Sequence, residues 1–169
     1  AQVFIPTAFF NSDLHAFWSA WLQSMREEQY ENGMIPIVIP NATGEFTETG
    51  WSDACTIIPW ETYWRTGDIQ VLKDNYDMML RWLDYSATHI SEGISNQRTV
   101  GDWLQPYSQQ EDERRGDTDN QLISTAYYAR SIEFTQRTAD VLGYPQKSAE
   151  LKKLHAEVKA AFQEKFFDK

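Results

Sequence analysis

The chain has 169 residues and a formal net charge of −10, with 15 basic residues against 25 acidic ones. Because no stretch is basic and no apolar run approaches the roughly 20 residues of a membrane span, we expect neither nucleic acid nor membrane as a partner. The single cysteine, Cys55, excludes an internal disulfide and a cysteine metal site, and its apolar surroundings predict a small core residue.

Five helical segments are predicted, because apolar residues recur at steps of three and four along most of the chain. They run approximately over residues 7–30, 52–66, 68–89, 119–142 and 145–166. The buried face of the first is expected to hold Phe10, Phe17 and Trp18, and Pro59 is expected to kink the second helix or to begin it late. The one strand candidate, residues 35–39, contains a proline and is short enough to be extended loop. The sequence therefore predicts an all-α fold.

The connections between these helices alternate between long and short. About twenty residues join the first helix to the second and more join the third to the fourth, whereas residues 66–68 and 143–145 span the other connections. Alternate connections of consecutive antiparallel helices emerge at opposite ends, and long loops in compact domains are usually functional. We therefore expect part of an α/α toroid with all long loops, and the functional site, on one face. A helical repeat array would show a fixed period, and none is found.

Two similar motifs lie in the long connections, and each places a tryptophan near an aspartate after a glycine. The segment Gly50-Trp51-Ser52-Asp53 opens the second helix, and Gly101-Asp102-Trp103-Leu104 lies between the third and the fourth. An indole stacks on the apolar face of a sugar ring, and a carboxylate accepts hydrogen bonds from its hydroxyl groups. Trp51, Trp103, Asp102 and Asp53 are therefore the candidate sugar-binding residues. Alternatively, Trp51 packs against the helix start, Asp53 is its N-cap and Asp102 is a turn residue.

Other residues are weaker candidates for chemistry. Glu61 is expected to be a helix-surface charge that pairs with Arg65, and Trp21 is expected to pack in the core. The charged run 109–119 is expected to be a solvated loop at the rim of the site. The three histidines have no partner at metal-ligand spacing, so we expect no metal site. The sequence also has no phosphate-binding glycine loop, and we expect no cofactor.

Eight short segments follow one another at characteristic spacings along nearly the whole chain. They are residues 1–4, 6–11, 35–40, 50–54, 59–63, 66–68, 101–104 and 125–129. Their joint order resembles the catalytic domain of bacterial α-L-rhamnosidases, an (α/α)6 barrel of inverting glycoside hydrolases. The resemblance implies that Trp51 and Trp103 line the subsite that holds the rhamnose ring.

The resemblance also implies that residues 1–169 form a partial barrel domain, with about five of the twelve helices of a closed barrel. It places the general acid before Ala1 and the general base after Lys169, so we expect the catalytic residues outside this chain. The complete enzyme is expected to cleave terminal α-L-rhamnosyl residues of a carbohydrate substrate by inversion. The isolated fragment is expected to associate with itself through exposed helix faces.

Three alternatives to this function stay open. The first is another α/α-toroid glycosidase, such as a relative of the glucoamylases or trehalases. The second is a helical sugar-binding module that keeps the tryptophans without catalysis. The third is an interaction scaffold, in which Trp51 and Trp103 are core residues.

Overall fold

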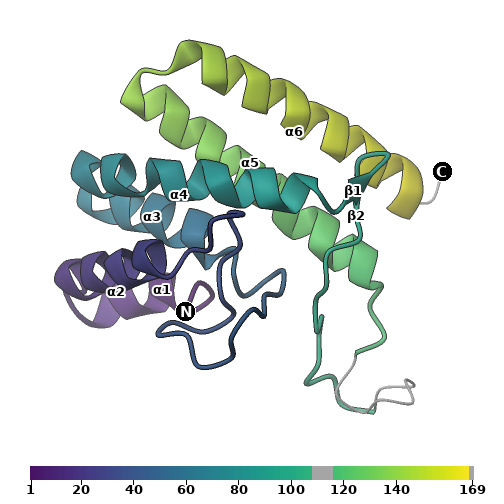
Figure 1. Ribbon diagram of the computed structural model, residues 1–169, viewed down its shortest axis with the longest axis horizontal. Helices are drawn as coiled ribbons and strands as arrows, with labels where there is room; N and C mark the ends of the chain where they lie inside the picture. The colour runs from purple at the N-terminus through teal and green to yellow at the C-terminus, as the bar shows by residue number, and fades with distance from the viewer. Residues whose placement is uncertain (108–115, 168–169) are drawn as a thin grey trace.

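The computed structural model describes residues 1–107 and 116–167. In this part of the chain the elements follow in the order α1 (Ile5–Asn11), α2 (His15–Glu27), α3 (Ala54–Thr66), α4 (Ile69–Ala87), β1 (Ile90–Ser91), β2 (Ile94–Ser95), α5 (Asn120–Leu142) and α6 (Pro145–Phe166). Helix α5 packs against α3, α4 and α6, and β1 and β2 form a small antiparallel hairpin (Figure 1). None of the described helices has the length and apolarity of a membrane span. The predicted all-α fold is confirmed, and residues 35–39 are loop.

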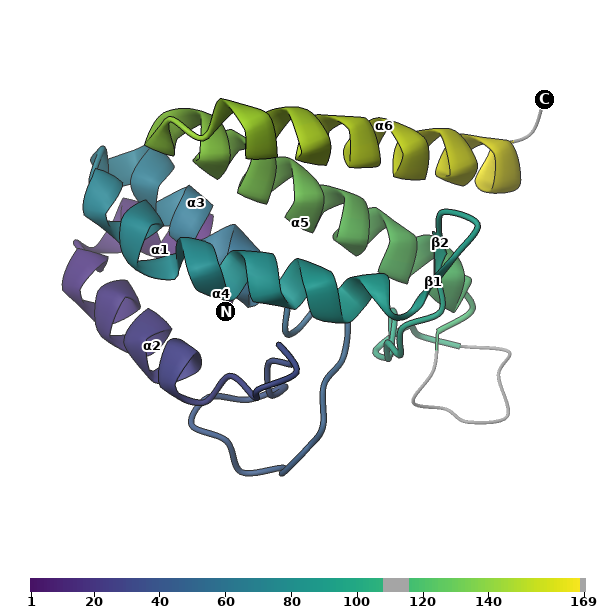
Figure 2. The same cartoon turned by 45° about the horizontal axis from the view of Figure 1, so that its top comes forward.

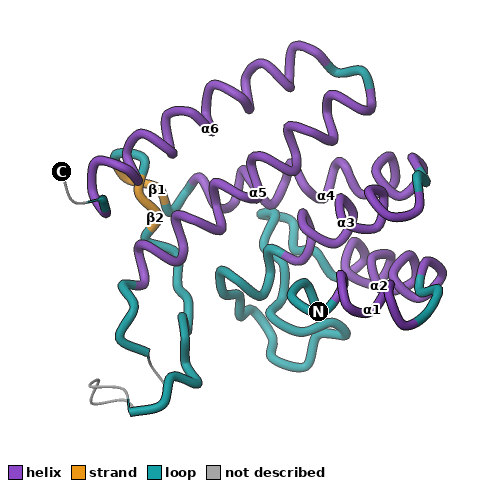
Figure 3. The backbone as a smooth tube through the Cα atoms, turned by 180° about the vertical axis from the view of Figure 1, so that it is seen from behind, coloured by secondary structure: helices purple, strands orange, loops and turns teal. Residues whose placement is uncertain are grey.

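The short turns and the long loops lie at opposite ends of the helices. The turns that join α1 to α2, α3 to α4 and α5 to α6 are gathered on one side (Figure 3). Helices α3 and α5 end at Gly67 and Gly143, and Asp68 then caps α4 by accepting a hydrogen bond from the Gln70 N–H. The described parts of the long loops, residues 28–53, 96–107 and 116–119, therefore emerge together at the other end, as the alternation of loop lengths predicts.

The predicted first helix is in fact two helices, because residues 12–14 interrupt it. The Asp13 carboxylate accepts a hydrogen bond from the N–H of His15, where α2 begins in a new direction (Figure 2). Residues before and after the break therefore no longer share one face. Phe10 is 90% exposed and Phe17 is 57% exposed, so the prediction that both face the core is wrong.

The apolar core lies mainly between α2, α3 and α4, with contributions from α1 and α5. Cys55 is fully buried in it and Trp18 is almost so, as predicted, and Trp82 is fully buried as well. Pro59 is also buried, and α3 begins well before it, so the alternative of a late start is excluded. The ion pair predicted between Glu61 and Arg65 forms on the surface of this helix.

Helix α5 buries several hydroxyl side chains beside its buried apolar residues Tyr128, Ile132 and Phe134. Its buried polar residues are Ser124, Thr125, Ser131, Thr135 and Thr138. The hydroxyl groups of Thr135 and Thr138 donate to the carbonyls four residues earlier, at 2.8 Å each. These bonds satisfy the hydroxyls without a partner on another helix. A central helix of the fold thus presents polar atoms to its neighbours.

Gly33 fixes the chain where it leaves α2. Its φ is +89°, and a Cβ atom at this position would overlap the carbonyl oxygen of Arg81 on α4. We expect Gly33→Ala to lower the free energy of unfolding by about 3 kcal/mol, because a left-handed conformation costs roughly 1–2 kcal/mol and overpacking a further 1–3 kcal/mol. Gly44→Ala is the matched control, since Gly44 has φ +71° but no atom within 4 Å of the added Cβ. Urea unfolding measures both variants, and equal losses of unfolding free energy in the two would contradict this account.

Candidate functional site

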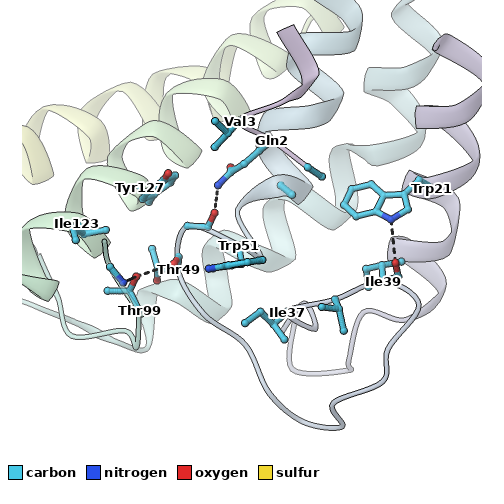
Figure 4. A pocket seen from close by; sticks show the side chains of 15 residues that line it. Gln2, Val3, Trp21, Ile37, Ile39, Thr49, Trp51, Thr99, Ile123 and Tyr127 are labelled. Atoms are coloured by element: carbon cyan, nitrogen blue, oxygen red, sulfur yellow. Dashed lines mark hydrogen bonds between the residues drawn. The ribbon is translucent and has the colours of Figure 1, made fainter. Parts of the chain in front are cut away.

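A pocket of about 430 Å³ opens beside the two long loops. The N-terminal segment, α2, both loops and α5 contribute to its wall (Figure 4). Aromatic and aliphatic side chains alternate there with a few polar groups, and no acidic side chain is among the described residues that line it. Its volume lies within the range of roughly 300–1,000 Å³ that is usual for small-molecule sites.

The two predicted tryptophans lie side by side, with Trp51 in the wall of this pocket and Trp103 against Trp51, outside the set of lining residues. Their ring centroids are 6.4 Å apart, and the ring planes are inclined by 51°. Trp51 is 42% exposed and lines the pocket, and Trp103 is 40% exposed and contacts Trp51. The fold thus brings together two motifs that lie far apart in the sequence, and it leaves part of each indole open to a ligand.

Asp102 lies next to Trp103 and is half-buried. Its Oδ2 accepts a hydrogen bond of 2.8 Å from the Thr118 hydroxyl, whereas its Oδ1 is buried and has no hydrogen-bond partner within the described ranges. Gly116 passes so close that a Cβ there would overlap the carboxylate. The end of the second long loop therefore closes on Asp102. Of the charged run predicted at this rim, residues 109–115 lie outside the described residues.

Asp53 points away from the pocket and is only 1% exposed. Its Oδ2 accepts a hydrogen bond of 2.7 Å from the Gly50 N–H. Its Oδ1 accepts hydrogen bonds from the Ser131 hydroxyl at 2.7 Å and from the Trp82 indole at 3.1 Å. Because protein donors occupy both oxygens, Asp53 holds the turn that carries Trp51 instead of contacting a sugar. It also occupies the N-cap position of α3 without capping it through its side chain.

Burial governs the electrostatics around Asp53. Loss of solvent raises the pKa of this carboxyl above its usual range, although the hydrogen bonds from Gly50, Ser131 and Trp82 act in the opposite direction. Burial, together with the nearby charge of Asp53, raises the pKa of the Cys55 thiol well above its ordinary value. The thiol is therefore neutral at physiological pH, and the cysteine is a core residue rather than a nucleophile.

The two long loops are joined to each other beside the pocket. The Thr49 N–H donates to the carbonyl of Arg98 at 2.9 Å. The Thr99 hydroxyl donates to the carbonyl of Thr49 at 3.0 Å and accepts from the N–H of Gly101 at 3.1 Å. Thr49, Thr99 and Gly101 all line the pocket. No local pattern in the sequence predicts these contacts between distant segments.

Several other lining residues were not predicted as part of the site. Gln2 donates from its side-chain amide to the carbonyl of Gly50, and the Tyr127 ring packs against the same glycine. Trp21 lines the pocket instead of lying fully in the core, and its indole N–H donates to the Ile39 carbonyl at 3.2 Å. Gln2 and Tyr127 fall in segments that carry the family resemblance, which was the one signal available for them.

The buried Asp53 carboxyl generates a prediction about pH. Since its pKa is raised in the folded state, its contribution to stability is greatest below the unfolded pKa and is lost as the pH rises through the folded pKa. We expect the unfolding free energy of the wild type, relative to that of Asp53→Asn, to increase as the pH falls from 7 towards 3.8. Urea unfolding at several pH values measures this, with the exposed Asp77→Asn as control. A difference that does not vary with pH would contradict it.

Known relatives match the chain along its whole length. The family described as the bacterial alpha-L-rhamnosidase 6 hairpin glycosidase domain matches residues 1–169. A protein of Formosa agariphila named alpha-L-rhamnosidase is 45% identical over 169 residues, which cover 99% of this chain and 18% of the relative. Another of that name from Alteromonas sp. is 42% identical over 171 residues, which cover 99% of this chain and 19% of the relative.

A solved structure has the same arrangement of elements. The Streptomyces avermitilis alpha-L-rhamnosidase complexed with L-rhamnose superposes with a TM-score of 0.87 and is 31% identical. The match covers 99% of this chain and 15% of that protein. The chain thus spans less than a fifth of the length of these relatives.

Proposed function

The chain belongs to the bacterial α-L-rhamnosidase six-hairpin glycosidase domain family, and on this premise we propose that it forms the sugar-binding wall of an inverting α-L-rhamnosidase. Membership in this family excludes the alternative that the chain comes from a relative of the glucoamylases or trehalases. The observation that carries the proposal is that Trp51 lines a pocket of small-ligand size and that Trp103, also partly exposed, packs beside it. The substrate is a carbohydrate that ends in an α-L-rhamnosyl residue.

The geometry of the two indoles suits a deoxy sugar. Rhamnose presents C–H groups and a methyl group as apolar surface, and its hydroxyl groups lie around the ring. Two ring planes inclined by 51° form an angled apolar wall, so one indole stacks on the sugar while the other contacts its edge. Asp102 lies next to Trp103, but its Oδ1 is buried against Gly116 and its Oδ2 accepts from the Thr118 hydroxyl, so the proposal assigns the sugar contact to the indoles rather than to this carboxylate.

The described residues of this chain supply binding rather than proton transfer in the proposal. Inversion requires two carboxyl groups on opposite faces of the sugar, roughly 6.5–9.5 Å apart. None of the described lining residues is acidic, and protein donors occupy both oxygens of Asp53. As the family resemblance implies, we propose that the general acid and the general base lie in parts of the enzyme outside these 169 residues.

Replacing either indole tests the proposed subsite. In the complete enzyme, Trp51→Ala and Trp103→Ala are each expected to lower kcat/KM for an α-L-rhamnoside by about 5- to 150-fold. This range corresponds to roughly 1–3 kcal/mol of lost stacking and apolar burial. Trp64→Ala is the matched control, since Trp64 is 71% exposed on α3. Steady-state kinetics and circular dichroism are measured together. Unchanged kinetics with a lowered Tm would show that the tryptophans only pack.

The isolated chain is expected not to hydrolyse rhamnosides at a useful rate. Loss of the proton donor and of the water activator each removes roughly 10²–10⁴ in rate. A chromogenic α-L-rhamnoside incubated with the purified chain measures this, with Asp102→Asn as a companion variant. Robust aglycone release that this variant abolishes would overturn the expectation and make Asp102 a catalytic residue. Sedimentation of the same preparation tests self-association, which the exposed Phe10 and Phe17 favour.

A further inference from the structure

Glu48, in the first long loop, is a carboxylate with no exposure to solvent. Neither of its side-chain oxygens has a hydrogen-bond partner among the described residues. The Nε atom of Arg98, in the second long loop, lies 2.8 Å from Glu48 Oε1 and supplies the compensating charge. The Arg98 side chain is itself 65% exposed, and its guanidinium group lies 4.6 Å from the ring centre of Phe46.

A buried ion pair of this kind specifies an arrangement more than it adds stability. Only the Glu48 carboxylate is removed from water, and its attraction to the exposed Arg98 guanidinium offsets the lost hydration without a large net gain in stability. Removing one partner, however, leaves a buried charge without compensation, which strongly disfavours any conformation that separates the two. Glu48 and Arg98 therefore hold the two loops in one relative position.

Each partner lies a few residues from one indole. The carbonyl of Glu48 accepts hydrogen bonds from the N–H groups of Trp51 at 3.2 Å and Ser52 at 3.0 Å, so Glu48 begins the turn that carries Trp51. Arg98 begins the segment that leads to Trp103, and its carbonyl accepts the hydrogen bond from the Thr49 N–H. The ion pair and this backbone contact thus join the two loops where each approaches its tryptophan.

We propose that the Glu48–Arg98 ion pair is a clasp that sets the separation and inclination of Trp51 and Trp103, and this rests on the proposed role of the two indoles in binding rhamnose. Asp53 fixes Trp51 to the helices, so the clasp positions Trp103 relative to Trp51. Neither Glu48 nor Arg98 lines the pocket beside Trp51. Both are therefore positioning residues.

A double-mutant cycle in the complete enzyme tests the clasp. Glu48→Gln, Arg98→Gln and the double variant are made in the wild type and in Trp103→Ala. L-rhamnose affinity is measured by tryptophan fluorescence, and KM and kcat with an α-L-rhamnoside. We expect each clasp variant to weaken L-rhamnose binding and raise KM about fivefold, with a smaller change in kcat, and to have no further effect when Trp103 is absent. Arg98→Lys keeps the charge and is expected to restore part of the affinity.

The controls separate positioning from stability. Arg137→Gln, which removes an exposed ion pair with Glu133 on α5, should leave L-rhamnose affinity unchanged. If Arg98→Gln does not fold, the variant with Gln at both positions replaces it, because that variant buries no charge. Its loss of affinity must likewise disappear when Trp103 is absent.

Three outcomes would overturn the clasp. Losses of affinity that add to that of Trp103→Ala would show that the ion pair acts through general stability. If Arg98→Gln loses affinity for L-rhamnose but Glu48→Gln does not, Arg98 contacts the sugar directly. Unchanged affinity in Trp51→Ala and Trp103→Ala would overturn the proposed function, and the clasp with it, whereas the first two outcomes overturn the clasp alone.

Discussion

The carboxylate of Asp53 accepts hydrogen bonds from a loop turn and from two helices, and the position of Trp51 depends on these bonds. A buried carboxylate is costly to desolvate, so each of its bonds has to form in the folded state. The donors come from the Gly50 turn, from Trp82 in α4 and from Ser131 in α5. Correct packing of these helices is therefore a condition for the shape of the pocket, although few of their residues line it.

Features that depend on neighbours in the sequence could be predicted. Glycines 67 and 143 mark helix ends whatever surrounds them, and the apolar periodicity of α4 sets its buried face. The alternation of loop lengths then requires the two tryptophan motifs to lie at one end of the stack, where Trp51 and Trp103 meet. The resemblance to the rhamnosidase family, also found in the sequence, is confirmed by the match over residues 1–169.

Features that depend on distant partners could not be predicted. Asp53 follows a tryptophan in a loop, which is equally typical of a sugar ligand, an N-cap and a buried anchor, and only the positions of Trp82 and Ser131 decide between them. The burial of Thr135 and Thr138 on α5 could not be predicted, because each hydroxyl donates to a carbonyl of its own helix and needs no partner that a sequence pattern would reveal. Glu48 is followed by a glycine-containing turn and would be taken for a solvated charge, yet Arg98 from the other loop compensates it in the interior.

The separation of short turns from long loops has a consequence for how such a domain diversifies. The entropy of closing a loop grows only slowly with its length, by roughly 0.6 kcal/mol for each doubling. Insertions in residues 40–45, which follow the lining residues 37–39 and lie before the contacts that join the two loops, would therefore change the chain beside the pocket at little cost to the helices. Insertions at the opposite end are less well tolerated, because its short turns set the distance between the helices that they join. The helical frame thus constrains chain length at one end of the fold and leaves it free to change at the end that carries the pocket.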